Sequence, residues 1–212
     1  MRTFGFRKFN HNRLLVLPLV LLSLGVIADE RIIFGSFERE SAKEGFNTLG
    51  VDIEVTETLN GFGVRSFKFN DKGFYHGDGF TFLTGDRQAC LPGICNSFDA
   101  RKVVASFEVG KDIGQWIPFV GLSIAVSHVE FEINTDRKYD LTKGLIAGSW
   151  YKLDTFILRG AVSHLDDGDN RTISGGLLYQ MDNRFALGAE LGWLLDSDVD
   201  RLSFSLQFGR SF

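Results

Sequence analysis

RLSFSLQFGRSF (residues 201–212) ends the chain with a strict alternation of side chains. Apolar residues occupy the even positions from Leu202 to Phe208, small or polar residues occupy the odd positions, and the last residue is Phe212. This alternation predicts a β-strand with one apolar and one polar face. The apolar face must meet either a protein core or a lipid bilayer, and the rest of the sequence decides between them.

The first 28 residues have the composition of a secretory signal peptide. They combine a head of four basic and no acidic residues, an apolar run over 14–24, and small residues at 26 and 28. The apolar run is shorter than the about 20 residues that a membrane-spanning helix needs. We therefore predict a signal peptide over 1–28, cleaved after Ala28, and an exported mature domain over 29–212.

The composition of the mature domain limits the class of protein to which it can belong. Without the signal peptide the chain keeps 19 basic and 27 acidic residues, a net charge of −8 that argues against a nucleic-acid partner. The whole chain has 24 glycines, 21 phenylalanines and 3 prolines. Because no second hydrophobic stretch could form a transmembrane helix, the chain is either a soluble β protein or a membrane β-barrel.

Alternating segments recur along the whole mature chain and favour the membrane barrel. We expect an all-β fold, a closed antiparallel up-and-down transmembrane β-barrel of about ten strands, with eight as the alternative. Its apolar faces would meet lipid and its polar faces would line the lumen. The predicted strands are 31–38, 50–56, 62–69, 100–110, 116–128, 141–153, 155–165, 171–180, 184–195 and 201–212.

The polar faces carry charged side chains of both signs. We predict that these form a paired network, which fills a lumen with little room beyond its own side chains. A wide pore is therefore not expected. The predicted lumen network consists of Glu54, Lys68, Glu108, Lys152, Arg159 and Glu190.

The connections between the predicted strands alternate in length, as they do between the two rims of an outer-membrane barrel. The largest predicted extracellular loop is 70–99, which contains the only two cysteines, Cys90 and Cys95. A Leu-Pro-Gly-Ile turn separates them, so we predict a disulfide in an oxidising compartment, with a redox or metal pair as the alternative. Short turns are predicted near 59–61, 111–115, 153–154 and 181–183, and longer connections at 39–46, 133–140, 166–170 and 196–200.

The signal peptide, the alternating strands and the terminal LQFGRSF together resemble the small bacterial outer-membrane β-barrels of the opacity-protein and Ail-type class. The resemblance implies a monomer in the outer membrane of a Gram-negative bacterium, in contact with membrane lipid and lipopolysaccharide. It also implies that the last strand is a signal for the barrel assembly machinery. The matching apolar positions are Phe204, Leu206, Phe208 and Phe212, whereas Arg210 stands where an apolar residue is commoner.

Two Ser-His pairs raise the question of catalysis. Ser127-His128 and Ser163-His164 both end predicted strands that lead to longer loops. Adjacent residues of a strand point to opposite faces, so each serine faces inward and each histidine faces the lipid headgroups, which keeps nucleophile and base apart. We therefore expect no catalytic residue.

Function is predicted less sharply than location, because a fold does not define an activity. We expect a non-enzymatic outer-membrane barrel whose extracellular loops mediate surface interaction or envelope integrity. A narrow pore for small solutes is one alternative, and an outer-leaflet lipid- or peptide-cleaving enzyme is the other. The acidic segments 166–170 and 196–200 are expected to be exposed turns, with Ca²⁺ binding as their alternative role; no metal and no cofactor is implied.

Overall fold

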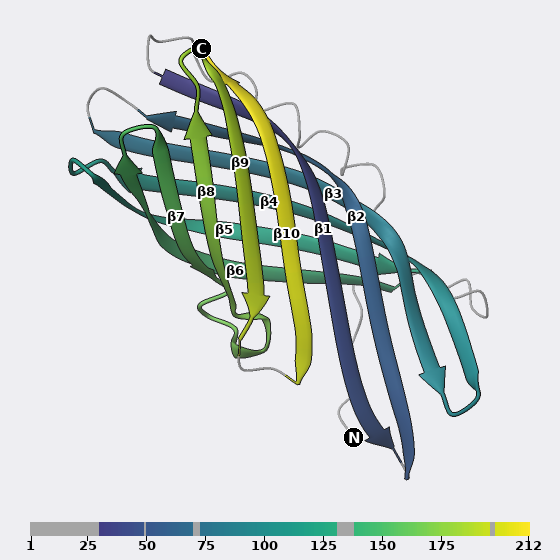
Figure 1. Cartoon of the computed structure of the whole chain (residues 1–212). Helices are drawn as coiled ribbons and strands as arrows, with labels where there is room; N and C mark the ends of the chain where they lie inside the picture. Colours follow the sequence, from purple (N-terminus) through teal and green to yellow (C-terminus); the bar gives the residue numbers. More distant parts are fainter. Residues whose placement is uncertain (1–29, 49, 70–72, 131–137, 196–197) are drawn as a thin grey trace, which may run out of the picture.

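A computed structural model describes residues 30–48, 50–69, 73–130, 138–195 and 198–212. The predicted signal peptide lies outside the described residues. Within them, ten antiparallel strands pair in chain order and β10 closes the barrel on β1 (Figure 1). No helix of this described part is long and apolar enough to cross a membrane. The elements are β1 (Glu30–Thr48), β2 (Val51–Phe69), β3 (Phe74–Leu91), β4 (Ile94–Lys111), β5 (Trp116–Val129), β6 (Lys138–Leu153), β7 (Phe156–Ser163), η3 (Gly168–Asn170), β8 (Thr172–Gln180), β9 (Phe185–Leu194) and β10 (Val199–Ser211).

The barrel is apolar outside and polar inside. On β10, Leu206 is 50 % and Phe208 58 % exposed, whereas the alternating residues Ser205 and Gln207 are buried in the lumen. A soluble barrel would bury these large apolar side chains, since exposing a contiguous apolar band to water is unfavourable. The terminal strand therefore faces lipid with its apolar side, as the alternation predicts.

The two rims differ. Short turns at 112–115, 154–155 and 181–184 lie on the rim that also carries both ends of the barrel chain, Glu30 and Phe212. We call this the periplasmic rim, because short turns mark that side in outer-membrane barrels. The opposite rim is the extracellular rim, and the strands reach it with unequal lengths. β1–β4 have 18 or 19 residues each, whereas β7–β9 have 8 to 10.

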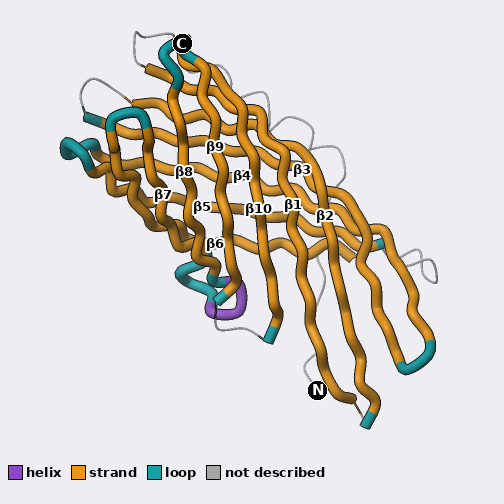
Figure 2. Tube along the Cα trace, viewed as in Figure 1, coloured by secondary structure: helices purple, strands orange, loops and turns teal. Residues whose placement is uncertain are grey.

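The long strands rise beyond the membrane. The outward apolar residues end at Phe37 on β1 and Phe82 on β3, and polar residues follow toward the extracellular tip. About 9 to 11 residues suffice for a strand to cross the bilayer. Figures 1 and 2 show the two hairpins continuing as paired strands past the ends of β7–β9. We call residues 39–60 and 84–101 the β1–β4 extension.

Two of the strand assignments predicted from the sequence are wrong, although the count of ten is correct. Segment 70–99 is not a loop, because β3 and the first part of β4 occupy it and pair across the turn at 92–93. Segments 50–56 and 62–69 are one strand, β2, so the turn predicted at 59–61 does not exist. One strand was missed and one was divided, and the two errors cancel. The predicted connection 39–46 likewise belongs to β1.

The periplasmic half of the lumen is filled with apolar and aromatic side chains. Phe67 and Trp150 have ring centroids 5.0 Å apart, and Tyr75 and Phe119 have theirs 5.7 Å apart. This apolar layer contains no charged residue and closes the lumen beneath the polar groups described next. It consists of the buried residues Ile32, Phe34, Phe67, Tyr75, Ile117, Phe119, Ile146, Trp150, Ala161, Leu178 and Ala186.

Candidate functional site

A chain of ion pairs crosses the middle of the lumen. The Arg159 guanidinium lies 2.5 Å from the Glu108 carboxylate and 2.9 Å from that of Glu190. Glu190 also binds Arg65 at 2.8 Å, and Arg65 reaches Glu38 at 3.5 Å. The five side chains are 7 to 22 % exposed and come from β1, β2, β4, β7 and β9. We call these residues the ion-pair layer.

Neighbouring hydroxyl groups donate further hydrogen bonds to two carboxylates of this layer. Tyr75 donates a hydrogen bond to Glu108 at 2.7 Å. Ser36 and Thr81 both donate to Glu38, at 2.9 and 3.0 Å. Buried charges are tolerated only when they are paired and hydrogen-bonded in this way. The ion-pair layer therefore lies next to the apolar layer, and the two together divide the lumen.

The predicted lumen network is correct in part. The structure joins Glu108, Arg159 and Glu190, and it adds Arg65 and Glu38, which are not among the predicted members. Arg65 shares the inward face of β2 with two small residues. Small residues are typical of a barrel lumen, so this pattern indicates that Arg65 faces inward.

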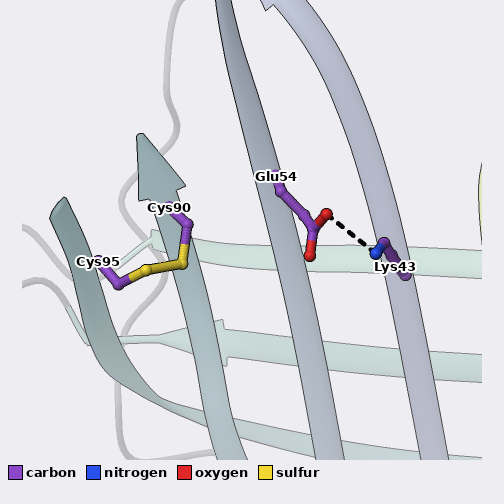
Figure 3. Close-up of a disulfide and its surroundings, with 4 residues drawn as sticks. All are labelled: Lys43, Glu54, Cys90 and Cys95. Carbon is purple, nitrogen blue, oxygen red and sulfur yellow. Dashed lines mark ion pairs between the residues drawn. A yellow bond between two sulfur atoms is a disulfide. The ribbon is translucent and has the colours of Figure 1, made fainter. Parts of the chain in front are cut away.

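Three other predicted members lie elsewhere. Lys152 pairs with Asp112 near the periplasmic rim. Glu54 binds Lys43 at 2.9 Å on the β1–β4 extension, where both side chains are more than half exposed (Figure 3). Lys68 stands three residues from the inward Arg65 and so faces outward. The predictions for Glu54 and Lys68 are wrong, because continuous β2 reverses the faces assigned to its two supposed halves.

The predicted disulfide is present. Cys90 and Cys95 are directly opposite each other on β3 and β4 and are bonded (Figure 3). The bond lies two strand positions from the 92–93 turn, so it closes the tip of a regular hairpin instead of an irregular loop. It ties the outer ends of β3 and β4 together.

A cavity of about 450 Å³ lies in the extracellular half of the lumen. It begins at Glu40, which follows Glu38 of the ion-pair layer on the same inward face of β1. Lys102 binds both oxygens of Glu40, at 2.7 and 2.8 Å, and the Nε of Arg201 lies 3.5 Å from the same carboxylate. Glu40 is 9 % exposed. Two cations thus share one carboxylate at the inner end of the cavity.

His164 belongs to this cavity and not to the lipid interface. It follows the last residue of β7 with a φ of 55°, a left-handed conformation that is uncommon outside glycine. The ring turns inward and packs on Gly144, where a Cβ would overlap it. Burial first, and then the positive charge of Lys102, lower the pKa of His164. The prediction of a lipid-facing His164 is wrong, because strand alternation ends where the backbone turns left-handed.

His128 keeps an outward strand position, as the alternation predicts, and it also borders the extracellular cavity. Its ring stacks on Tyr139 with centroids 4.7 Å apart, and its Nε2 lies 3.3 Å from Glu130. Ser127 lines the cavity on the opposite face of β5. Both ring nitrogens of His164 lack a hydrogen-bond partner within the described residues.

The acidic loop after β7 uses its carboxylates to order its own backbone. Asp166 accepts a hydrogen bond from the Leu145 N–H at 2.8 Å, which lowers its pKa. Asp167 caps η3 by accepting from the Asp169 N–H at 3.1 Å. The described residues contain no group of three or more His, Cys, Asp or Glu side chains arranged for a metal ion. Residues 196–197 of the second acidic segment lie outside that description.

The apolar residues of the last strand lie on the outer face of the barrel, which contacts the membrane. Leu206 and Phe208 face outward, Phe204 shares their face, and Phe212 is 68 % exposed at the periplasmic rim. Arg210 lies over the rings of Phe185 and Phe212. Recognition of these residues by the assembly machinery stays a prediction.

Comparison with known proteins supports the architecture. The translocator domain of autotransporter NalP from Neisseria meningitidis has a TM-score of 0.52 and 10 % identity over 92 % of each chain. The fold is that of a bacterial outer-membrane β-barrel. Ail of Yersinia pestis has a TM-score of 0.47 and 12 % identity over 88 % of this chain and 100 % of its own. OprG from Pseudomonas aeruginosa has a TM-score of 0.41 and 16 % identity over 89 % and 98 %. No family model and no curated protein matches the sequence.

This outer-membrane barrel keeps the orientation of side chains that a lipid environment demands, with an apolar outside and a polar, partitioned inside. Its location is the bacterial outer membrane. The likeness to solved structures concerns the fold, so function has to be argued from the ion-pair layer, the cavity and the β1–β4 extension.

Proposed function

We propose that this outer-membrane barrel is non-enzymatic and acts through its β1–β4 extension, which contacts host or matrix surfaces outside the cell. The observation that carries the proposal is the length of the four strands. They exceed the membrane-spanning length by roughly 8 residues each, about 26 Å of strand. Transmembrane function alone does not require this length.

The extension is built as a stiff, apolar-tipped structure. Its strands remain paired to within one residue of each tip, and the disulfide locks the second hairpin. Phe46 and Val51 are 43 % and 40 % exposed at one tip, and Leu91 and Ile94 are 44 % and 62 % exposed at the other. Exposed apolar side chains on a rigid projection are suited to bind a partner, because little conformational entropy is lost on contact.

The closed lumen supports surface binding over solute transport. A pore needs a continuous polar path, whereas here the ion-pair layer and the apolar layer lie in series between the cavity and the periplasmic rim. We therefore propose that the barrel does not conduct. A non-enzymatic role is supported by the two Ser-His pairs. Ser127 and His128 hold strand positions on opposite faces of β5, and both ring nitrogens of His164 lack a hydrogen-bond partner within the described residues, so Ser163 is not hydrogen-bonded to that ring.

Surface binding is tested by shortening the first hairpin. Deleting residues 44–47 and 52–55 removes four paired positions from each strand and preserves both the alternation and the 48–51 turn. Bacterial cells that display the intact chain should adhere to immobilised matrix proteins or cultured host cells, and cells that display the shortened chain should not. A heat-modifiable band of equal intensity for both variants is the control for folding. Equal adhesion of both would refute the role of the extension.

Conductance in a planar bilayer tests the closed lumen. We expect no steady channel from the intact barrel. A channel whose conductance rises when Arg159 is replaced by alanine would establish the narrow-pore alternative, because Arg159 stands at the centre of the partition.

A further inference from the structure

The extracellular cavity has the size of a small-molecule site. Its volume of about 450 Å³ falls within the roughly 300 to 1,000 Å³ that is usual for ligand pockets. Its lining comes from β1–β6, β10 and the loop after β7, so closure of the barrel brings residues far apart in sequence together. The cavity lies on the extracellular side of the ion-pair layer, which separates it from the periplasm.

The inner end of the cavity carries an excess of positive charge. Lys102 and Arg201 both face the single carboxylate of Glu40, which balances only one of them. Farther out, Glu57 stands directly opposite Arg87 on the paired strands β2 and β3. The remaining acidic group, Asp140, is exposed to solvent. An unbalanced cation in a partly dehydrated site is unfavourable, and a bound anion would offset it.

Hydrogen-bonding groups with unused capacity lie at the same place. Both ring nitrogens of His164 are buried and lack hydrogen-bond partners within the described residues. The Nε of Arg201 is also buried, and at 3.5 Å from the Glu40 carboxylate it forms an ion pair without a hydrogen bond. Buried polar atoms are nearly always paired in folded proteins, so their presence beside a cavity points to a ligand with both acceptor oxygens and donating hydroxyls, because one nitrogen of a neutral imidazole donates and the other accepts. Ser127, Thr142 and Asn170 also line the cavity and supply groups that bind hydroxyls.

We infer that the cavity binds a small organic anion with one acidic group and neighbouring hydroxyls, of the kind of a sugar acid, through Lys102, Arg201 and His164. The acidic group lies against the two cations, and the hydroxyls meet the polar wall. This site is distinct from the β1–β4 tips and does not depend on their binding a surface.

Calorimetry on the full barrel in detergent micelles tests the inference with three probes. Glucuronate should bind at one site per barrel, and glucose, which has nearly the same shape and no charge, should not. Inorganic phosphate should compete with glucuronate, because both present acceptor oxygens to the same cations. Failure of glucuronate to bind, or equal binding of glucose, would overturn the inference.

Matched variants locate the site. Arg201→Gln should weaken glucuronate binding roughly ten-fold or more, because it removes a charged hydrogen-bond donor. Arg39→Gln makes the same charge change on the outer face of β1 and should leave binding unchanged. Equal effects of the two variants would overturn the inference, and Lys102→Gln replaces Arg201→Gln in this comparison if the latter does not fold.

A third variant should change the affinity for glucuronate in the opposite direction. Glu40→Gln removes the carboxylate that competes with the ligand for Lys102 and Arg201, so glucuronate should bind it more tightly and raise its thermal stability more than that of the parent. Unchanged or weaker binding by a folded Glu40→Gln barrel would contradict the inference. A conducting barrel that still binds glucuronate would refute the proposed closed lumen and leave this site intact.

Discussion

Replacing Arg159 with methionine removes the cation at the centre of the ion-pair layer while keeping a side chain of similar length. The Arg159 side chain is 7 % exposed and binds Glu108 and Glu190 at 2.5 and 2.9 Å. Its guanidinium also lies over the Phe119 ring, 5.0 Å from the centroid. Methionine retains the apolar contact with Phe119 and loses both ion pairs, so the variant isolates the electrostatic contribution.

The expected loss of unfolding free energy is about 3 to 4 kcal/mol. Removing one partner of a buried ion pair costs about 3 to 5 kcal/mol, because the other charge stays buried without compensation. The lower part of that range applies here. Glu190 retains Arg65 at 2.8 Å, and Glu108 retains the hydrogen bond from Tyr75 at 2.7 Å.

Equilibrium urea unfolding of the barrel in lipid vesicles, followed by tryptophan fluorescence, measures this loss. Arg210→Met is the matched control. Arg210 lies on the exposed outer face over two rings, 5.7 and 5.8 Å from their centroids, so its loss should be below about 1 kcal/mol. Adding Glu108→Gln to Arg159→Met should restore at least about 1 kcal/mol, because it removes one uncompensated charge. Equal losses for Arg159→Met and Arg210→Met would refute the reasoning.

Three further perturbations have defined outcomes. Replacing Cys90 and Cys95 with serine should lower the stability of the hairpin tip by about 2 kcal/mol, the loop-entropy value for so short a ring; limited proteolysis should detect cleavage near the 92–93 turn while the heat-modifiable shift is unchanged. Gly61→Ala should reduce the folded fraction on a heat-modifiability gel, because the methyl group would overlap a carbonyl oxygen of β3, whereas Gly160→Ala meets nothing within 4 Å and should fold normally. Burial first, and then the neighbouring cations, lower the pKa of His164 in the folded barrel. As the pH falls, the unfolded chain therefore binds a proton at His164 before the folded barrel does, and the free energy of unfolding should decrease below about pH 6.5. His164→Gln should lose less stability between pH 7 and 5 in parallel urea titrations, and an equal loss would contradict this.

Strands whose outer face is continuously apolar could be predicted from the sequence. β9, β10 and the part of β5 from Val120 onward alternate outward apolar residues with small or polar ones, because lipid lies on one side and the crowded lumen on the other. β3 departs from this pattern. The polar residues His76 and Asp78 stand on its outer face near the periplasmic rim, with the His76 Nε2 3.1 Å from the Asp78 carboxylate, and Gly77 and Gly79 stand on its inner face. Neither face is continuously apolar, so the sequence pattern predicts a loop where the structure has β3.

The β1–β4 extension obscured the pattern for a different reason. Beyond the bilayer both faces of a hairpin meet water, except where the inner face lines the cavity, so alternation no longer distinguishes strand from loop. Segment 39–46 of β1 is mostly polar for this reason. The outer part of β2 does alternate, with apolar residues at 51, 53 and 55, but there the apolar face turns inward and Val55 lines the cavity. The local pattern therefore predicts that Glu54 faces the lumen. In the continuous strand β2, Glu54 lies on the face opposite to the inward Arg65.

The cavity could not be predicted, because it depends on contacts that only the closed barrel creates. Glu40 and Lys102 are 62 positions apart and meet across the lumen from strands that do not pair. His164 reaches the same place through a left-handed backbone. A local pattern carries no information about either event.

The unequal strand lengths connect the extension to the cavity. β1–β4 raise one side of the extracellular rim, and β7–β9 leave the other side low, as Figure 1 shows. The cavity lies between them, with Arg87 from the tall side and Asn170 from the low side in its wall. A small solute therefore has its direct approach over the low rim, beside the loop that Asp166 and Asp167 order. A large partner bound to the tips stands about 26 Å of strand farther out, so both ligands can be bound at once, and binding of one should leave the affinity for the other unchanged unless the partner covers the low rim.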